Sequence, residues 1–436
     1  MKLTAQKRKS GSDKTDKLKN NKEEKMLKKG FSLGTVQMLA VFYLVVWTTS
    51  PPLEIDLIYR LLALGLAAVW FIIMFIRDNP VVMEKEHLAS LFFVLAIILV
   101  VYIDTGSFSQ IIKQISFFMF TICFIVSCFY RGRWDEIKGI VPVLMVLLIF
   151  WNFKTYSVLL EDPTVARLLV RADAATYDYL RQGVGGYSLV YPQVCICPAI
   201  LAWIIKAFRG NKVYFTIGAV WLVSFVLLIA KAGYSLAIFG AAAGAVILFF
   251  YKGKSGIKAF LVSLLIFAAA MLSILYIEDL RNFLLEFFDG TAVAKKINDL
   301  VATGESGSAE GSIQLRIDAY LYSLQVAAKY PIVGALWREG NGSHSAVLDV
   351  LAKYGLWGAA IFCTIIYSVP NYYKKKYNDV YIRSVANATF VSLMIISTLD
   401  AFNYSFSCMI LIVLPLLFED IIKWTGVETD ENTLVS

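Results

Sequence analysis

The feature that most constrains this chain is a series of long apolar runs separated by short polar links. About twelve of the runs approach the roughly 17–25 residues that an α-helix needs to cross a bilayer. They lie near residues 31–49, 57–76, 88–103, 109–130, 137–153, 187–206, 213–230, 234–251, 259–277, 354–370, 379–398 and 404–424. In hydrocarbon every backbone N–H and C=O group must be bonded within its own segment, so these runs predict helices. We therefore expect an all-α integral membrane protein with about twelve transmembrane helices.

The composition excludes an ordinary soluble protein. Of the 436 residues, 58% are hydrophobic and 17% are charged, whereas soluble domains carry roughly 45–50% apolar and about 25% charged residues. We expect one polytopic membrane domain over residues 31–424, a disordered basic tail over 1–30 and a second tail over 425–436. The six cysteines fall within apolar runs, so no disulfide framework is expected. No residue pattern predicts a metal site or a cofactor.

The distribution of lysine and arginine predicts the orientation of the helices. Every second link is basic and shares a side with the basic N-terminus, and a bias of this kind marks the cytoplasmic side. The basic links carry Arg77 and Lys85, Arg131, Arg133 and Lys138, Lys206, Arg209 and Lys212, Lys252, Lys254 and Lys258, and Lys374, Lys375 and Lys376. We expect a bacterial inner (cytoplasmic) membrane protein with both termini in the cytoplasm. The net charge of +8 follows from this bias, so the expected partner is the lipid bilayer and not nucleic acid.

Two connections on the opposite side are long and rich in arginine, which the charge bias does not explain. The first external loop, residues 154–186, carries Arg167, Arg171 and Arg181 in segments with helical spacing. The second, residues 278–343, begins with an amphipathic segment that suits a helix lying in the membrane interface. A Gly/Ser stretch follows, and then a helix that carries Arg316 and ends before Pro331. Short helices are therefore expected inside both loops.

His344 lies at the end of the second loop. It follows "GNGS" and precedes "SAVLDVLAKYGL", which resumes helical periodicity, so its imidazole is expected at a helix N-terminus. The positive end of the helix dipole keeps an imidazole neutral and attracts phosphate. Glu339 and Asp349 are further candidates, either as a base or for orienting the histidine. The alternative is a helix-terminal histidine with a purely structural role.

The stretch from Arg316 to Phe362 resembles the C-terminal signature of the O-antigen ligase and O-antigen polymerase superfamily. That signature joins an external arginine, a Pro-x-x-Gly, a glycine-rich turn and a histidine opening a helix that ends in "YGxxG". The matching residues are Arg316, Pro331, Gly334, Gly340, Gly342, His344, Tyr354, Gly355 and Gly358. Two departures from the ligase pattern are Ser345, where ligases have Asn, and Lys231-Ala232-Gly233, where many members have Ser-Arg. The resemblance therefore favours a capsule or O-antigen repeat-unit polymerase.

The resemblance implies a glycosyltransferase that is metal-independent and inverting. It would move a glycan from undecaprenyl pyrophosphate to the sugar hydroxyl of another lipid-linked repeat at the outer face of the membrane. His344 would be the general base and Arg316 the main ligand of the pyrophosphate, since guanidinium binds phosphate oxygens bidentately. The further candidates for binding the pyrophosphate are Arg171, Arg181, Arg167, Arg338, Arg60, Lys113 and Lys231. A chain-length regulator protein is the protein partner that the resemblance suggests.

Three other functions fit parts of the sequence. An O-antigen ligase would share the chemistry and differ in its acceptor, a lipid A core. A multi-span transporter or flippase would fit the helix count, Pro192 and Pro198 breaking the sixth helix, and Gly240 and Gly244 in the eighth, although that glycine pair is more simply a helix-packing motif. A polyprenyl-phosphate-sugar glycosyltransferase would use an acidic pair in the first external link, residues 54 and 56.

Overall fold

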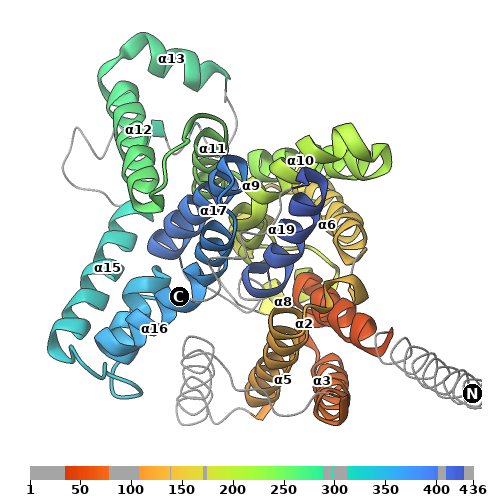
Figure 1. Ribbon diagram of the computed structural model, residues 1–436. Coiled ribbons are helices and arrows are strands. Elements are labelled where there is room, and N and C mark those ends of the chain that lie inside the picture. The colour runs from red at the N-terminus through yellow and green to blue at the C-terminus, as the bar shows by residue number, and fades with distance from the viewer. Residues whose placement is uncertain are drawn as a thin grey trace, which may run out of the picture.

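The computed structural model describes residues 35–77, 108–137, 139–169, 174–287, 294, 297–298, 312–400 and 409–426, and within these ranges the regular structure is helical (Figure 1). The helices of the first half are Thr35–Thr49, α2 (Pro51–Ile55), α3 (Leu57–Arg77), α5 (Phe108–Phe124), α6 (Ile140–Glu161), α7 (Val165–Leu168), α8 (Ala174–Arg181) and α9 (Tyr187–Gly210). Those of the second half are α10 (Lys212–Ala232), α11 (Ser235–Phe250), α12 (Gly256–Tyr276), α13 (Glu278–Phe287), α15 (Ser312–Lys329), α16 (Ala346–Lys376), α17 (Val380–Leu399) and α19 (Leu414–Thr425). Short π-helices, Ile125–Tyr130 and Met409–Val413, extend α5 and precede α19.

The apolar character of these helices confirms an all-α membrane protein. Within the described residues, 6 helices are long and apolar enough to cross a bilayer, namely α3, α6, α9, α10, α16 and α17. Shorter apolar helices cover Thr35–Thr49, Met119–Phe129, Ser235–Phe250 and Gly256–Ala269. The predicted span 88–103, the tail 1–30 and most of the tail 425–436 lie outside the described residues.

The connection between α6 and α9 is shorter than the predicted loop 154–186, because α6 continues to Glu161 and does not end at 153. Leu159 and Leu160 extend the apolar pattern of the helix by a further turn. The helix ends at Asp162, whose carboxylate accepts hydrogen bonds from the backbone N–H and the hydroxyl of Thr164. These two bonds lower the pKa of Asp162. A local turn of this kind stops a helix that the apolar pattern alone would continue.

α9 is the central helix of the bundle and packs against α10, α11, α17 and α19 (Figure 1). Pro192 and Pro198 were expected to break it, and this expectation is wrong, because α9 runs from Tyr187 to Gly210 with both prolines inside it. Neighbouring helices on all sides hold the backbone in place, which is how membrane helices tolerate proline. The unbroken helix removes one of the features that favoured a transporter.

A buried polar network joins α6, α9 and α10 inside this bundle. The amide of Asn152 donates to Gln193 Oε1 at 3.1 Å and to Ser224 Oγ at 3.2 Å, and Gln193 Nε2 donates back to Asn152 Oδ1 at 2.9 Å. The indole of Trp221 also donates to Gln193 Oε1, at 2.8 Å. All four side chains are fully buried. In an apolar environment such groups are stable only when they are bonded to one another.

α11 and α17 approach each other closely through glycine. Ser392 of α17 donates its hydroxyl to the carbonyl of Gly240 at 3.0 Å. A Cβ atom added at Gly244 would overlap Ser392 Oγ and lie 2.6 Å from the ring of Pro198. The Gly240–Gly244 pair is therefore a helix-packing motif, as the simpler interpretation of the sequence predicted.

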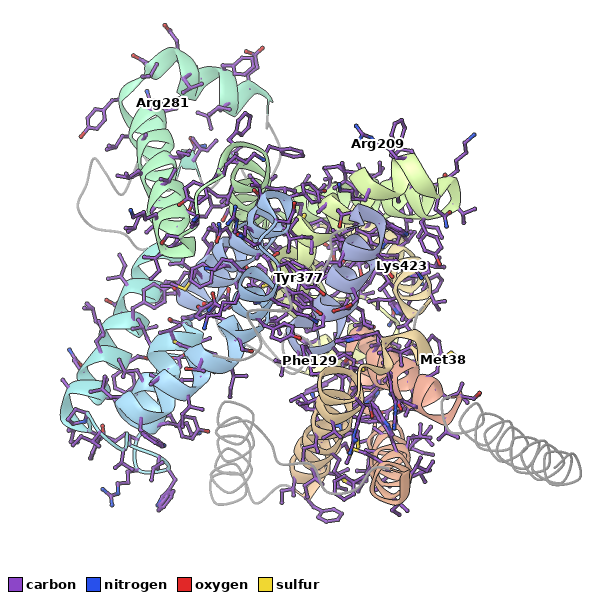
Figure 2. All side chains as sticks on the ribbon, in the orientation of Figure 1. Met38, Phe129, Arg209, Arg281, Tyr377 and Lys423 are labelled. Atoms are coloured by element: carbon purple, nitrogen blue, oxygen red, sulfur yellow. The ribbon has the colours of Figure 1, made fainter. Side chains whose placement is uncertain are left out.

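Two basic links lie together at one end of the bundle. The ammonium group of Lys206 sits 4.3 Å from the ring of Tyr381, and the amide of Asn387 donates to the carbonyl of Gly253 at 2.8 Å. These contacts bring the last turns of α9 and the link after α11 to the start of α17, and Arg209, in the last turn of α9, is exposed at the surface (Figure 2). At the other end of α17 the backbone N–H of Ala346 donates to the carbonyl of Asp400 at 2.8 Å. The start of α16 therefore lies at the end of the bundle away from these basic links.

Candidate functional site

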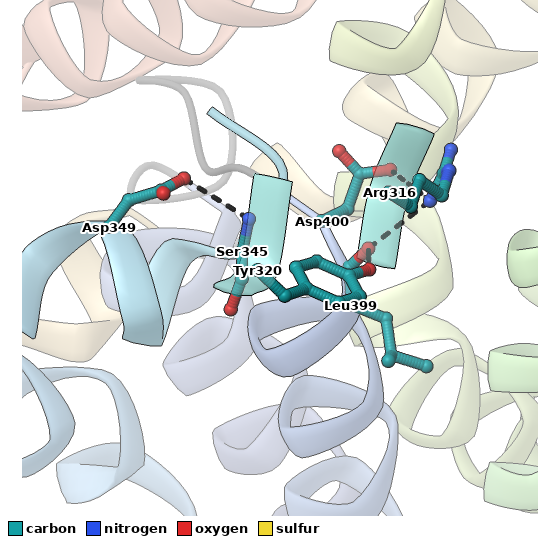
Figure 3. Close-up of polar contacts among 6 residues, drawn as sticks. All are labelled: Arg316, Tyr320, Ser345, Asp349, Leu399 and Asp400. Carbon is teal, nitrogen blue, oxygen red and sulfur yellow. Dashed lines mark hydrogen bonds and ion pairs between the residues drawn. The ribbon is translucent and has the colours of Figure 1, made fainter. Parts of the chain in front are cut away.

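The C-terminal end of α17 is the anchor of the candidate site. The carbonyl oxygen of Leu399 accepts hydrogen bonds from Arg316 Nη1 at 3.3 Å and from the hydroxyl of Tyr320 at 2.9 Å (Figure 3). The carboxylate of Asp400 lies 3.8 Å from Arg316 Nη1. Arg316 and Tyr320 are i,i+4 neighbours on α15, so one face of α15 is turned toward the end of α17. The outer face of α15 instead exposes Ile317, Leu321 and Leu324.

The guanidinium of Arg316 is held among polar groups and keeps its charge. Its Nη1 lies between the carbonyl oxygen of Leu399 and the carboxylate of Asp400, and 30% of the side chain stays exposed. Burial lowers the pKa of Arg316, but the carboxylate of Asp400 and the nearby tyrosines more than offset this, so the pKa is raised. A permanently charged, partly accessible guanidinium is a binding site for phosphate or carboxylate.

Three tyrosines pack together at the start of α9 and in the turn between α10 and α11, and the sequence interpretation missed them. The rings of Tyr187 and Tyr191, i,i+4 neighbours on α9, are stacked with centroids 4.7 Å apart. The ring of Tyr234, from the turn between α10 and α11, meets Tyr187 edge-on, also at 4.7 Å. Its hydroxyl donates to the carbonyl of Ala166 at 3.3 Å. The signal available in the sequence was a pair of i,i+4 tyrosines opening an apolar run.

The loop that carries His344, residues 340–345, is held by the buried carboxylate of Asp349 (Figure 3). Asp349 Oδ1 accepts the backbone N–H of Ser343 at 3.2 Å, and Oδ2 accepts that of Ser345 at 3.1 Å. The two residues flanking His344 are thus fixed by one side chain. Ser345 caps α16 by accepting the N–H of Leu348 at 3.2 Å, so the predicted helix after His344 is confirmed. The imidazole itself is half-buried.

The same loop is bonded to α15. Ser323 donates its hydroxyl to Asp349 Oδ1 at 2.7 Å and accepts the backbone N–H of Gly342 at 2.8 Å. A Cβ atom at Gly342 would overlap the carbonyl of Ala319 on α15. Together with the bond from Ala346 to Asp400, these contacts attach the His344 loop to α15 and α17. Arg316 and the His344 loop are therefore anchored on the same residue, Asp400.

The remaining motif residues build the scaffold under this loop. Gly355, with φ 69°, interrupts α16, and Gly334, with φ 78°, forms the turn after α15. The turn and the interruption bond to each other: Leu356 N donates to the carbonyl of Pro331 at 2.8 Å, and Ala335 N donates to that of Ala352 at 2.8 Å. A Cβ atom at Gly355 would overlap the carbonyl of Ile332. These glycines are needed for close backbone contact and positive φ.

Glu339 and Arg338 take up other positions on the loop surface. The carboxylate of Glu339 pairs with Lys329 and accepts the hydroxyl of Tyr330 at 3.1 Å. The hydrogen bond from Lys329 lowers the pKa of Glu339. Arg338 is exposed. The observed contacts of Glu339 thus belong to a surface ion pair.

The other predicted cations lie on other elements of the bundle. Arg181 of α8 lies 3.8 Å from the carboxylate of Asp56 between α2 and α3, one of the two acidic residues that the sequence singled out. Arg60 of α3 donates to Ser109 Oγ at 2.6 Å, Lys113 of α5 is buried, and Lys231 is half-buried in the last turn of α10. Arg171 and the side chains of residues 54 and 167 lie outside the described residues.

No family model matches this chain, and no curated protein is significantly similar to it. What the site can do chemically is therefore inferred from the positions of its own residues. A charged guanidinium with a neighbouring phenol hydroxyl can bind a phosphate-type anion. A half-buried imidazole one residue before a helix N-cap can accept a proton when it is neutral. The combination is suited to displacing a phosphorylated leaving group by a hydroxyl nucleophile.

Proposed function

We propose that this protein is a polysaccharide repeat-unit polymerase, a glycosyltransferase resembling the O-antigen ligase and O-antigen polymerase superfamily. The observation that carries the proposal is the common anchorage of Arg316 and the His344 loop on Asp400. This anchorage connects Arg316, the proposed ligand of the pyrophosphate, with the loop of His344, the proposed base, although the two residues are separated along the chain. The donor is a glycan on undecaprenyl pyrophosphate, and the acceptor is a sugar hydroxyl of another lipid-linked repeat.

In the proposed reaction the acceptor oxygen attacks the anomeric carbon of the donor sugar. The bond from that carbon to the pyrophosphate oxygen breaks, and undecaprenyl pyrophosphate leaves with the electron pair. His344 takes the proton of the attacking hydroxyl, a role worth roughly 10²–10⁴-fold in rate. Arg316 stabilises the negative charge that develops on the leaving pyrophosphate. A single displacement inverts the configuration at the anomeric carbon and requires neither a nucleotide nor a metal ion.

The proposal includes a location for this chemistry. The basic links mark the cytoplasmic side of a bacterial inner membrane, so the site at the far end of α17 would open at the outer face. About twelve spans with both termini in the cytoplasm complete this topology. Substrates carried on a lipid would then reach Arg316 from the membrane surface, and a chain-length regulator would act from the same side.

Two rival functions make different use of the same bundle. An O-antigen ligase would keep the donor chemistry and use a lipid A core as acceptor; Ser345, where ligases have Asn, favours the polymerase. A transporter would concentrate polar groups along a path near the bilayer midplane. The polar network of Asn152 and Gln193 lies deep in the bundle, but its members bond to one another and carry no charge.

The test is elongation of lipid-linked repeats by the purified protein in liposomes, without nucleotide or metal. We expect His344→Ala and Arg316→Ala each to lower the rate of elongation by about 10²-fold or more. Arg281→Ala, which removes a cation from α13, is the matched control and should elongate normally. Full-length polymer made by His344→Ala would remove the histidine from the mechanism, and transport without elongation by the wild type would favour the transporter.

A further inference from the structure

One side of α15 is apolar and exposed. The residues of this side are Ile317, Leu321, Leu324 and Ala328. Their spacing of i, i+4, i+7 and i+11 places them along one line of the helix, which we call the α15 stripe. At the rise of an α-helix the stripe is about 16 Å long.

The rest of α15 divides into a packed side and a polar side. The packed side carries Arg316 and Ser323, which bond to α17 and to α16. The polar side carries the exposed residues Asp318, Gln325 and Lys329. A helix whose exposed surface is apolar along one line and polar along another is typical of a membrane interface, where the first line faces lipid and the second faces water.

The turn after α15 extends this apolar surface to α16, which lies beside the end of α15 (Figure 1). Ile332 and Val333 of the turn are exposed, and Leu356 and Trp357 of α16 are 63% and 73% exposed. The backbone N–H of Leu356 donates to the carbonyl of Pro331 at 2.8 Å, so the two exposed pairs are neighbours. Extended apolar surfaces of this kind mark interaction sites.

The position of Leu356 along α16 indicates the depth of this surface. α16 carries no charged residue from Leu356 to Tyr373, and it then ends in the lysines of residues 374–376. A helix of that length is about 27 Å long, which is close to the roughly 30 Å of hydrocarbon in a bilayer. Because the lysines mark one membrane surface, Leu356 and Trp357 fall at the other, where tryptophan is enriched.

α15 is attached near both ends to helices that can cross the bilayer. Near its start, Arg316 and Tyr320 bond to the carbonyl of Leu399, the last residue of α17. Just after its end, Pro331 bonds to Leu356 of α16. α16 and α17 are each long and apolar enough to cross a bilayer, and α17 begins where α16 ends. The two attachment points therefore lie on the same membrane side, and α15 runs along that surface.

We propose that the α15 stripe, the turn after it and Trp357 dock into the lipid leaflet on the side of the candidate site. The apolar side chains enter the acyl-chain boundary, while Asp318 and Lys329 stay in water. The bilayer is the partner because this surface continues the apolar wall of a spanning helix at its interfacial end. Ile317 adjoins Arg316, so the contact holds the guanidinium at the level of the lipid headgroups. This docking goes beyond the proposed function and does not depend on it.

The first experiment identifies what touches the α15 stripe. p-Benzoylphenylalanine replaces Leu321 on the stripe, or Gln325 on the polar side as the matched control, in the full chain in liposomes of phosphatidylethanolamine and phosphatidylglycerol. After irradiation we expect mass spectrometry to find phospholipid adducts at position 321 and few or none at position 325. Crosslinks from position 321 to a second copy of the chain, absence of lipid adducts there, or equal lipid adducts at both positions would overturn the proposal.

The second experiment uses smaller substitutions that leave the packed side of α15 unchanged. Leu321→Cys and Gln325→Cys are treated in nanodiscs with a charged maleimide, and labelling is measured peptide by peptide, so that the native cysteines do not interfere. Lipid disfavours the reactive thiolate, so we expect Leu321→Cys to react at least about tenfold more slowly than Gln325→Cys. The two rates should become equal in the unfolded chain. Equal rates in nanodiscs would show that water covers the stripe. Neither experiment involves a substrate, so failure would leave the proposed function to its own test by elongation.

Discussion

The guanidinium of Arg316 lies 3.8 Å from the carboxylate of Asp400, at the point where α17 ends. The backbone carbonyl of Asp400 also accepts the N–H of Ala346, next to the His344 loop. One residue thus holds two segments that 28 positions of sequence separate (344 minus 316). Its carboxyl group is mostly buried, with 10% of the side chain exposed. Asp400 therefore contacts both parts of the candidate site.

Replacing Asp400 with Asn should impair the site more than the fold. Asp400→Asn keeps the shape and the backbone bond to Ala346, but it leaves the Arg316 charge without its carboxylate. We expect elongation to fall at least about tenfold and unfolding free energy to drop by about 1–3 kcal/mol. Asp318→Asn, on the exposed face of α15, is the control for charge removal. Wild-type elongation by Asp400→Asn would show that this carboxylate does not position Arg316.

Asp349→Ala should release the His344 loop. The variant removes the acceptor for the N–H groups of Ser343 and Ser345 and for the hydroxyl of Ser323. Ser323 and Ser345 are buried, and leaving a buried donor unpaired costs about 1–3 kcal/mol. Ser345→Ala removes only the helix cap and should cost about 1 kcal/mol. Hydrogen exchange at residues 340–346 should rise strongly in Asp349→Ala and little in Ser345→Ala. Equal protection in both variants would contradict the conclusion that Asp349 holds the His344 loop.

Gly355→Ala should disrupt the interrupted part of α16. Alanine at φ 69° is strained, and its Cβ would also overlap the carbonyl of Ile332. We expect a loss of about 1–3 kcal/mol or more, measured by thermal unfolding in detergent. Gly340→Ala is the matched control, because a Cβ there meets nothing within 4 Å. A stable Gly355→Ala protein would mean that the turn after α15 does not pack as described.

Gly244→Ala should loosen the contact between α11 and α17. The added methyl group meets Ser392 Oγ and the ring of Pro198, and overpacking of this kind costs about 1–3 kcal/mol. The control is Gly65→Ala in α3, where a Cβ has open space and helix propensity favours alanine by about 1 kcal/mol. We therefore expect Gly244→Ala to lower the melting temperature and Gly65→Ala to raise it. A Gly244→Ala protein as stable as the wild type would argue against the close approach of these helices.

The sequence predicted the helices well and the tertiary contacts poorly. Apolar runs marked α9, α10 and α17 to within a few residues, because a helix that crosses a bilayer needs a long apolar segment. The end of α6 was misplaced since a single turn at Asp162 decides it. Pro192 and Pro198 were misread because packing by neighbouring helices outweighs the local effect of proline.

The candidate site was predicted only in part. Arg316, His344 and Asp349 stood out as polar residues, and the structure ties the loop around His344 to Asp349 and to the end of α17 by hydrogen bonds of Ser343, Ser345 and Ala346. Tyr187 and Asp400 escaped notice because Tyr187 opens an apolar helix and Asp400 follows one, and polar residues are ordinary at both places. The importance of Asp400 arises from its contacts with Arg316 and Ala346, and a single sequence carries no record of which helices touch.

The amides of Asn152 and Gln193 have a consequence for how the chain is made. Each helix enters the membrane in turn, and α9 would expose an unbonded amide to lipid until α6 is beside it, with the Trp221 indole of α10 still to come. The three helices therefore have reason to assemble while synthesis continues, before α11 to α19 are released. Biogenesis of this membrane protein would then proceed through an early three-helix intermediate onto which the later helices are added.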